Sequence, residues 1–178
     1  ITSLARRSPD INQRSGVSVR VSIANYESVI ANALIRAIRL GEEKAVPRIS
    51  DLPYIAASTA GKIEMESVEE GREGRIMDEL IKKAVVGAFG RYLSVQDFTQ
   101  LIRHFEEGLS VDTSEVHPSS HYAHLAKETP GFADAFRRLG VKDDPASIAS
   151  AMEFILEGLH LNRRLNREKL ESGYRYKG

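Results

Sequence analysis

Residues 14–42 read RSGVSVRVSIANYESVIANALIRAIRLGE and carry the pattern of a long helix, around which the rest of the chain is organised. Gly16 and Ser18 are typical of a turn followed by a helix N-cap, and about six turns follow without Gly or Pro. Apolar side chains recur there every three or four residues, which predicts one inward-facing stripe on a helix over about 18–40. The members of the stripe are Ile23, Tyr26, Val29, Ile30, Ala33, Leu34, Ala37 and Ile38.

Both ends of this predicted helix carry charges. Gly41 is a typical helix terminator, and Arg36 and Arg39 precede it, where cations favour the negative end of the helix dipole. Together with Glu42 and Glu43 we expect these arginines to form an exposed face. Arg20 lies in the first turn, where backbone N–H groups point outward, and this combination suits a phosphate.

Composition limits the classes of protein to consider. The chain has 178 residues, with 25 Lys plus Arg against 25 Asp plus Glu, so its net charge is zero and no overall field draws it to nucleic acid or anionic membranes. It has no Cys, which excludes disulfides and thiolate metal sites and fits a reducing, cytoplasmic location. No apolar run approaches the ~20 residues that cross a bilayer. The chain begins at Ile1 rather than Met, and we expect a C-terminal piece of a longer protein.

Helical periods dominate the remaining sequence, which predicts an all-α fold, a helical bundle with a C-terminal helical extension. The pattern divides into a linker or hinge over 1–17, a helical bundle over 18–92 and the extension over 93–178. Helices are expected at 50–66 with Ser50 as cap, at 75–92, at 95–108 after a capping box on Ser94, at 132–139, and at 146–162 with a possible kinked continuation to 170. We expect residues 67–74 to be a mobile loop, 111–122 to be irregular, and 172–178 to be a disordered tail.

The chain lacks the motifs of a free-standing enzyme. It has no phosphate-binding GxxxxGK[ST] loop, no GxSxG and no HExxH, so we expect no catalytic residue and no cofactor or metal bound by the chain alone. His117, His121 and His124 approach the spacing of a zinc set, but Pro118 interrupts a continuous helix, and we favour a solvated loop. His104 and His160 are expected to be half-buried and hydrogen-bonded within helices.

Charged clusters have ordinary interpretations. Glu64, Glu66, Glu69, Glu70 and Glu73 form an acidic run with interleaved arginines, typical of a solvated loop. A second interpretation joins five arginines and the tail at 174–177 in one basic patch: Arg137, Arg138, Arg163, Arg164 and Arg167. Complementation of helix dipoles is the favoured explanation for these arginines.

The order of a linker, Gly16-Val17-Ser18-Val19-Arg20 and a long amphipathic helix resembles the lid subdomain of AAA+ ATPases of the magnesium chelatase and MoxR-like branch. The run SPDINQRSGVSVR over 8–20, PRISDLP over 47–53 and EGLHLNRR over 157–164 look like proteins classed as magnesium-chelatase-related ATPases. In that family an arginine called sensor 2 opens a lid helix and reaches the γ-phosphate of ATP. The resemblance therefore implies this role for Arg20.

The same resemblance implies the other parts of the parent protein and its partners. The family joins a P-loop α/β domain, which binds ATP and Mg, to this lid, and the parent would be an ATPase although this piece alone is not an enzyme. It implies contact with the N-terminal P-loop domain of the same protein, a homo-oligomeric ring and a possible von Willebrand A-type partner, with no membrane contact. The work done would be metal insertion or remodelling of a partner.

Two other classes remain open. One is a helical protein-interaction module whose groove takes a partner's helix. The other is a DNA-binding domain of a transcriptional regulator, which would use a helix over 144–162 with Arg163 and Arg164. Zero net charge makes nucleic acid an unlikely partner.

Overall fold

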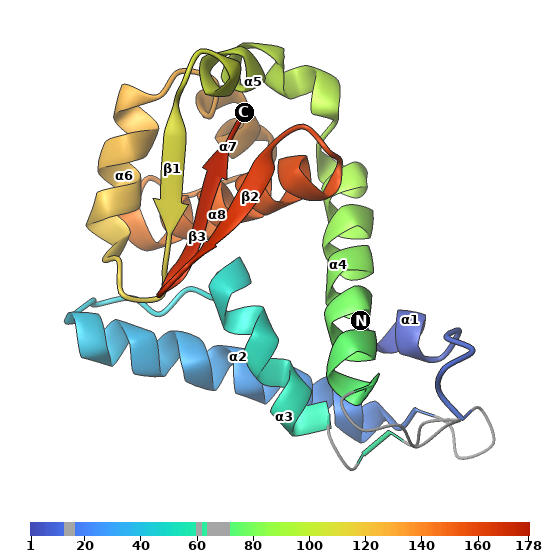
Figure 1. Cartoon of the computed structure of the whole chain (residues 1–178). Helices are drawn as coiled ribbons and strands as arrows, with labels where there is room; N and C mark the ends of the chain where they lie inside the picture. The colour runs from blue at the N-terminus through green and yellow to red at the C-terminus, as the bar shows by residue number, and fades with distance from the viewer. Residues whose placement is uncertain (13–16, 60–61, 64–71) are drawn as a thin grey trace.

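The computed structural model describes residues 1–12, 17–59, 62–63 and 72–178. The fold is mostly helical, at 63%, and carries a small three-stranded antiparallel sheet (Figure 1). The α-helices in the described part are α1 (Thr2–Ala5), α2 (Val19–Leu40), α3 (Ile55–Thr59), α4 (Arg72–Tyr92), α5 (Thr99–Glu106), α6 (Ser119–Glu128), α7 (Ala133–Arg138) and α8 (Pro145–Leu161). The 3-10 helices are η1 (Ile49–Tyr54) and η2 (Val95–Phe98), and the strands are β1 (Ser110–Thr113), β2 (Asn166–Leu170) and β3 (Gly173–Lys177).

Local capping signals set the ends of the long helices. The Ser18 side chain accepts the Arg20 N–H at 3.1 Å, and Gly41 closes α2 in the left-handed conformation at φ 65°. Asp144 caps α8 by accepting the Ser147 N–H at 3.1 Å. These three predictions are confirmed. Of the linker or hinge expected over 1–17, residues 13–16, which include Gly16, lie outside the described residues.

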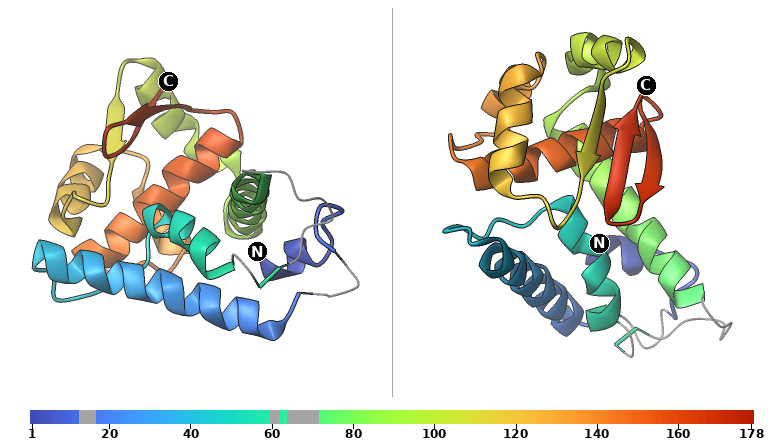
Figure 2. Two further views of the ribbon diagram at one scale, coloured as in Figure 1. Left: turned by 60° about the horizontal axis from the view of Figure 1, so that its bottom comes forward. Right: turned by 60° about the vertical axis from the view of Figure 1, so that its left-hand side comes forward.

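Two apolar clusters form the interior, and α4 belongs to both. The N-terminal cluster joins α1, the first half of α2, α3 and the first half of α4; its buried members include Ala5, Ile11, Val21, Ile55, Ile76, Met77 and Leu80. The C-terminal cluster surrounds α8 and includes Phe89, Phe98, Leu101, Phe105, Tyr122, Met152, Ile155, Leu156 and Leu159. Figure 2 shows α4 running from the N-terminal helices up to the C-terminal half. The border predicted at residue 92 thus falls at the end of a helix that already contributes to the second cluster.

Helices α4 and α8 approach closely at Gly158. A Cβ built there would lie 2.0 Å from Cδ2 of Phe89, so only glycine leaves room for the ring. Phe89 is itself held between Phe98 and Phe154, with ring centroids 5.8 and 6.0 Å away. This contact joins the two halves of the molecule.

The prediction of a purely all-α fold is wrong, because the C-terminal segment forms a β-hairpin. Strands β2 and β3 pair antiparallel, β1 pairs with the other edge of β3, and the order is β1-β3-β2. Tyr176 points inward from β3 and is 2% exposed. Residues 172–178, which were expected to be a disordered tail, are therefore held to the core. Gly173 turns the chain at φ 117°, and a Cβ there would lie 1.9 Å from the Thr113 carbonyl oxygen.

Other predicted elements also needed correction. The expected irregular segment 111–122 begins in β1 and ends in α6, and the kinked continuation of α8 to residue 170 is β2 instead. The helix expected from 50 opens as η1, whose N-cap is Arg48 rather than Ser50, with the Asp51 carboxylate accepting the Arg48 N–H at 2.8 Å. The described part of the mobile loop expected at 67–74 is residues 72–74, which are helical.

Candidate functional site

Arg20 lies at the exposed start of α2. Its side chain is solvent-exposed, and no hydrogen bond or ion pair joins its guanidinium to another described residue. Its backbone N–H donates to the Ser18 hydroxyl at 3.1 Å. Arg20 thus places a fixed positive charge at the positive end of a 22-residue helix.

The opposite end of α2 is locked to the rest of the molecule by buried charges. Arg36 is 3% exposed and its Nη2 lies 2.9 Å from Oδ2 of Asp51, which is also buried. Arg36 further donates to the Val46 carbonyl at 2.8 Å. The prediction that Arg36 is part of an exposed face is wrong. The spacing of residues along α2 could not reveal that the connection after this helix folds back and brings Asp51 to Arg36.

Arg48 holds this connection against the C-terminal half. Its fully buried side chain donates to the Ser119 hydroxyl at 2.6 Å and to the His117 carbonyl at 3.0 Å, and its guanidinium lies 4.8 Å from the ring centre of Tyr122. Glu42 balances its charge at 3.4 Å and also accepts the Ser119 N–H. Glu42 also lies 3.6 Å from Arg36, so one carboxylate joins both buried arginines, and its truncation would remove an acidic partner from each.

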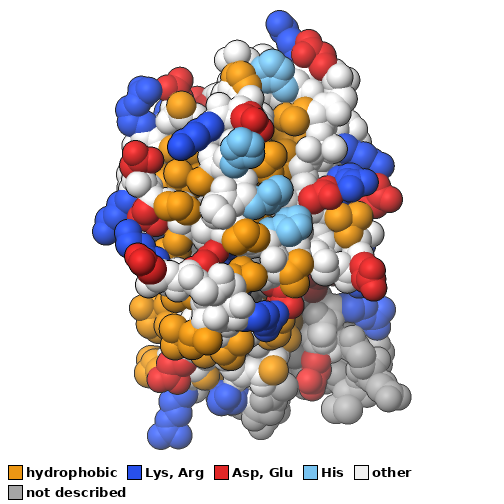
Figure 3. Space-filling view, turned by 90° about the vertical axis from the view of Figure 1, so that its left-hand side faces the viewer, with side chains coloured by type: hydrophobic (Ala, Val, Ile, Leu, Met, Phe, Trp, Pro, Cys, Tyr) orange, Lys and Arg blue, Asp and Glu red, His pale blue; other side chains and the backbone are white. Residues whose placement is uncertain are grey.

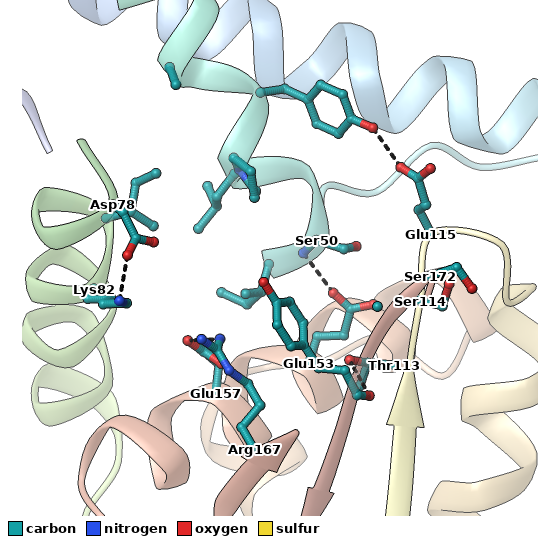
Figure 4. Close-up of a pocket in the computed structure, with 18 of the residues that line it drawn as sticks. Ser50, Asp78, Lys82, Thr113, Ser114, Glu115, Glu153, Glu157, Arg167 and Ser172 are labelled. Carbon is teal, nitrogen blue, oxygen red and sulfur yellow. Dashed lines mark hydrogen bonds and ion pairs between the residues drawn. The ribbon is translucent and has the colours of Figure 1, made fainter. Parts of the chain in front are cut away.

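A cleft of about 490 Å³ lies between the two halves, walled by η1 and α4 on one side and by α8 and the hairpin on the other (Figure 4). Glu153 is 2% exposed at its floor; Ser50 N–H and Tyr122 O–H donate to its two oxygens, both at 2.9 Å. Burial raises the pKa of Glu153 above its ordinary value, although Ser50, Arg48 and Tyr122 oppose the shift. Burial also raises the pKa of the Tyr122 hydroxyl.

Glu157, one turn further along α8, forms a second buried ionic group in the cleft wall. Arg167 Nη1 contacts its two oxygens at 2.7 and 2.8 Å, and Tyr176 O–H donates at 2.7 Å. The Tyr174 ring lies 4.2 Å from the Arg167 guanidinium carbon. The two buried carboxylates of the cleft, Glu153 and Glu157, are thus engaged by neighbours from other elements, and they hold α8 to η1 and to the hairpin rather than presenting a free acid or base.

The histidines do not assemble a metal site. Rings of His117 and His121 approach at 4.7 Å between centroids, but His124 lies beside Glu128 at 3.3 Å and faces solvent. Within the described ranges, no three His, Cys, Asp or Glu side chains come together to hold an ion. Burial lowers the pKa of His121.

His104 and His160 are half-buried as expected. His160 Nδ1 lies 3.0 Å from the Leu165 carbonyl oxygen, and His104 Nδ1 lies 3.5 Å from Glu107.

The arginines of the conceivable basic patch are mostly paired with acids. Arg167 binds Glu157, and two others pair at the surface: Arg137 with Asp134 at 2.8 Å, and Arg138 with Asp97 at 2.6 Å. The tail expected to join the patch is β3 of the sheet. Of the acidic run, Glu64, Glu66, Glu69 and Glu70 lie outside the described residues.

Comparisons with protein-family models, with curated proteins and with solved structures find no match. In the part of the chain that the structure describes, no helix has the length and apolar character needed to span a membrane.

Sequence reasoning named Arg20 but missed the groups that join the halves. The partners of these groups lie far away in the chain. Ser119 is 71 residues from Arg48, Tyr122 is 31 residues from Glu153, and Tyr176 is 19 residues from Glu157. One signal was available: Glu153 and Glu157 interrupt an otherwise apolar helix, and acids in such positions are buried only when they are paired.

Proposed function

We propose that this chain is the C-terminal lid portion of an AAA+ ATPase related to magnesium chelatase, and that Arg20 senses the γ-phosphate of ATP held with Mg by a P-loop domain elsewhere in the parent protein. The observation that supports this role is the exposed Arg20 guanidinium at the start of α2, without a described carboxylate partner. An arginine already paired with a carboxylate in its own helical bundle could not bind the γ-phosphate.

The second part of the proposal is that residues 93–178 move with the lid. Helix α2 carries Arg20 at one end, and at its other end Arg36 is held to Asp51. The connection after α2 is held in turn to the C-terminal half by Arg48, Ser50 N–H and Ser150 O–H. A charge-assisted contact at Arg20 would therefore bias the position of the whole body when triphosphate is present and release it after hydrolysis.

The parent would convert this movement into remodelling of a partner or metal insertion, working as a ring with a possible von Willebrand A-type partner. One arginine–phosphate contact in a partly enclosed site is worth roughly 2–4 kcal/mol, enough to shift a hinge balanced within a few kcal/mol.

The test is Arg20→Ala in the parent ATPase, with Arg103→Ala, another exposed arginine, as the matched control. We expect kcat/KM for ATP to fall about 30-fold or more in Arg20→Ala, from about 2 kcal/mol of lost contact, with an unchanged circular dichroism spectrum. Wild-type turnover would remove Arg20 from the mechanism. Micromolar ATP binding by the isolated 178-residue chain would place the nucleotide site elsewhere, and a parent gene without a GxxxxGK[ST] motif would contradict the whole proposal.

A helical protein-interaction module is the second candidate, and one observation favours it. Several large apolar side chains of α2 are exposed, whereas three arginines of the conceivable basic patch, Arg137, Arg138 and Arg167, are paired with acids. The surface is therefore better suited to protein than to nucleic acid.

A further inference from the structure

The apolar face of α2 points away from the core. Its exposed side chains recur every three or four residues along the helix: Val19, Ile23, Tyr26, Ile30, Leu34, Ile35 and Ile38. The prediction that the apolar stripe of this helix is buried is wrong for most members, since of those predicted only Ala33 and Ala37 are buried. Figure 3 shows apolar side chains gathered low on the molecule, over α2. Nothing among the described residues identifies what covers this face.

The cleft between the two halves, in contrast, has a defined interior. Its volume of about 490 Å³ lies within the range of roughly 300–1,000 Å³ that is typical of small-molecule sites. Leu52 of η1 and Met77 and Ile81 of α4 make one wall largely apolar, and the Tyr174 ring belongs to the opposite wall. A ligand with an apolar body would therefore find apolar contacts from both halves of the molecule.

The floor of the cleft is polar. The Ser50 N–H donates to Oε2 of Glu153 at 2.9 Å, which brings the Ser50 side chain beside this carboxylate (Figure 4). The Ser50 hydroxyl oxygen is buried, and no described residue forms a hydrogen bond with it. The hydrogen bonds that Glu153 accepts from Ser50 and Tyr122 come from uncharged donors. Since each carboxylate oxygen has a second lone pair, the floor offers unused acceptors from Ser50 and Glu153 at adjacent positions.

The cleft carries an excess of negative charge. The charged side chains that the described part of the chain places in its lining are Asp78, Glu115, Glu153, Glu157, Glu171, Lys82 and Arg167. Both bases are already paired with acids of the lining, Lys82 with Asp78 at 2.5 Å and Arg167 with Glu157 at 2.7 Å. A cleft lined mainly by one sign of charge concentrates ligands of the opposite sign.

We propose that this cleft binds a primary amine with an apolar body, whose ammonium group is held at the floor by Glu153 and the Ser50 hydroxyl. An ammonium has three donors and no acceptor, which matches a floor with unused acceptors. It would also supply the buried Glu153 carboxylate with a cation, whereas an alcohol would not and a carboxylate ligand would add to the negative charge. No residue of α2 lines the cleft, so this site is separate from Arg20 and independent of the proposed function.

The experiment is an NMR titration of the 178-residue chain with hexylamine, hexanol and hexanoate, which share one apolar body. At about pH 8 the amine is protonated and the acid is ionised. We expect hexylamine to shift the amide signals of Ser50, Met77 and Tyr174 with a Kd of about 1 mM, in keeping with its small size. Hexanol should bind at least about tenfold more weakly, because it lacks the charge. Hexanoate should give no saturable shifts.

Two variants locate the ammonium group. Ser50→Ala removes the hydroxyl but keeps the backbone N–H that binds Glu153, so it should weaken hexylamine binding about tenfold without a change in the circular dichroism spectrum. Glu153→Gln removes the charge and should abolish the preference for hexylamine over hexanol. The matched control is Glu106→Gln, which changes an exposed carboxylate outside the cleft and should alter neither result.

Three outcomes would overturn the proposal. Equal affinity for hexylamine and hexanol would refute the assignment of a cation, and saturable binding of hexanoate at these amides would refute the sign of the charge. Shifts by hexylamine that respond to neither Ser50→Ala nor Glu153→Gln would place the amine elsewhere. If Glu153→Gln failed to fold, Ser50→Ala and the ranking of the three probes would still decide. The titration contains no ATP, so its result is distinct from that of Arg20→Ala in the parent.

Discussion

Gly158→Ala should weaken the junction between the two halves of the molecule through a single methyl group. The new Cβ would lie 2.0, 2.6 and 2.8 Å from three ring atoms of Phe89, which is 1% exposed. The ring cannot yield easily because Phe98 and Phe154 flank it. Overpacking of this kind costs about 3 kcal/mol, and the better helix propensity of alanine returns about 1 kcal/mol. We expect a net loss of about 2 kcal/mol in the free energy of unfolding.

The same chain offers a control of opposite sign. Gly87 lies in α4, exposed, with no atom within 4 Å of a Cβ built on it. Gly87→Ala should therefore gain up to about 1 kcal/mol from helix propensity alone. For a chain of this size, thermal unfolding should move down by about 4–8 °C for Gly158→Ala and up by about 2–4 °C for Gly87→Ala.

The assay is thermal unfolding by circular dichroism, with urea titrations to obtain the free energy. Phe89→Leu/Gly158→Ala should recover part of the loss, because the smaller side chain makes room for the methyl group. If Gly158→Ala and Gly87→Ala both raised the midpoint, the close approach of α4 and α8 would be refuted. The rigid connection through which Arg20 is proposed to act would then lose its central contact.

Three further predictions concern buried charges and caps. Asp51→Ala should lower the free energy of unfolding by about 3 kcal/mol in urea titrations, because it removes the nearer of the two carboxylates that pair with buried Arg36 and leaves Glu42 at 3.6 Å; a loss below about 1 kcal/mol would contradict the buried pair. Burial raises the folded-state pKa of Glu153, so the folded state holds its proton more tightly and stability falls as pH rises from about 4.3 through that raised pKa. Glu153→Gln should remove this contribution, and urea titrations across the window should show the variant gaining on the wild type as pH rises; a constant difference would count against the titration. Asp144→Ala should cost about 1 kcal/mol by the same measurement through loss of the Ser147 N–H contact, whereas exposed Asp143→Ala should be nearly neutral.

Helix boundaries were predictable wherever the signal is local. Ser18, Gly41 and the Asp144-Pro145 pair act through backbone groups within four residues, and the structure has α2 and α8 where those residues place them. Inward residues of α4 and α5 are predictable in the same way, because each helix has one clearly apolar side. Phe89, Leu101 and Phe105 are all buried.

The sheet was missed because its pattern is short and charged. Strands β2 and β3 read NREKL and GYRYK, so each offers five residues and few apolar positions. Alternation is visible in Tyr174 and Tyr176, and Ser172-Gly173 is a plausible turn, but three strands must pair before any of them is stable. The partner β1 lies more than 50 residues away in the chain.

By itself, the sequence determined the long helices α2, α4 and α8, the caps Ser18, Gly41 and Asp144, the absence of cysteine chemistry and the position of Arg20 at the start of the longest helix. Only the tertiary structure decided which side of α2 is covered and which charges are buried. The physical reason is that periodicity reports apolar spacing along one helix, whereas burial depends on segments that arrive from elsewhere in the chain. Asp51 and Ser119 reach Arg36 and Arg48 in this way. The side of α2 that bears Tyr26, Leu34 and Ile38 remains exposed because no described segment of the chain packs over it.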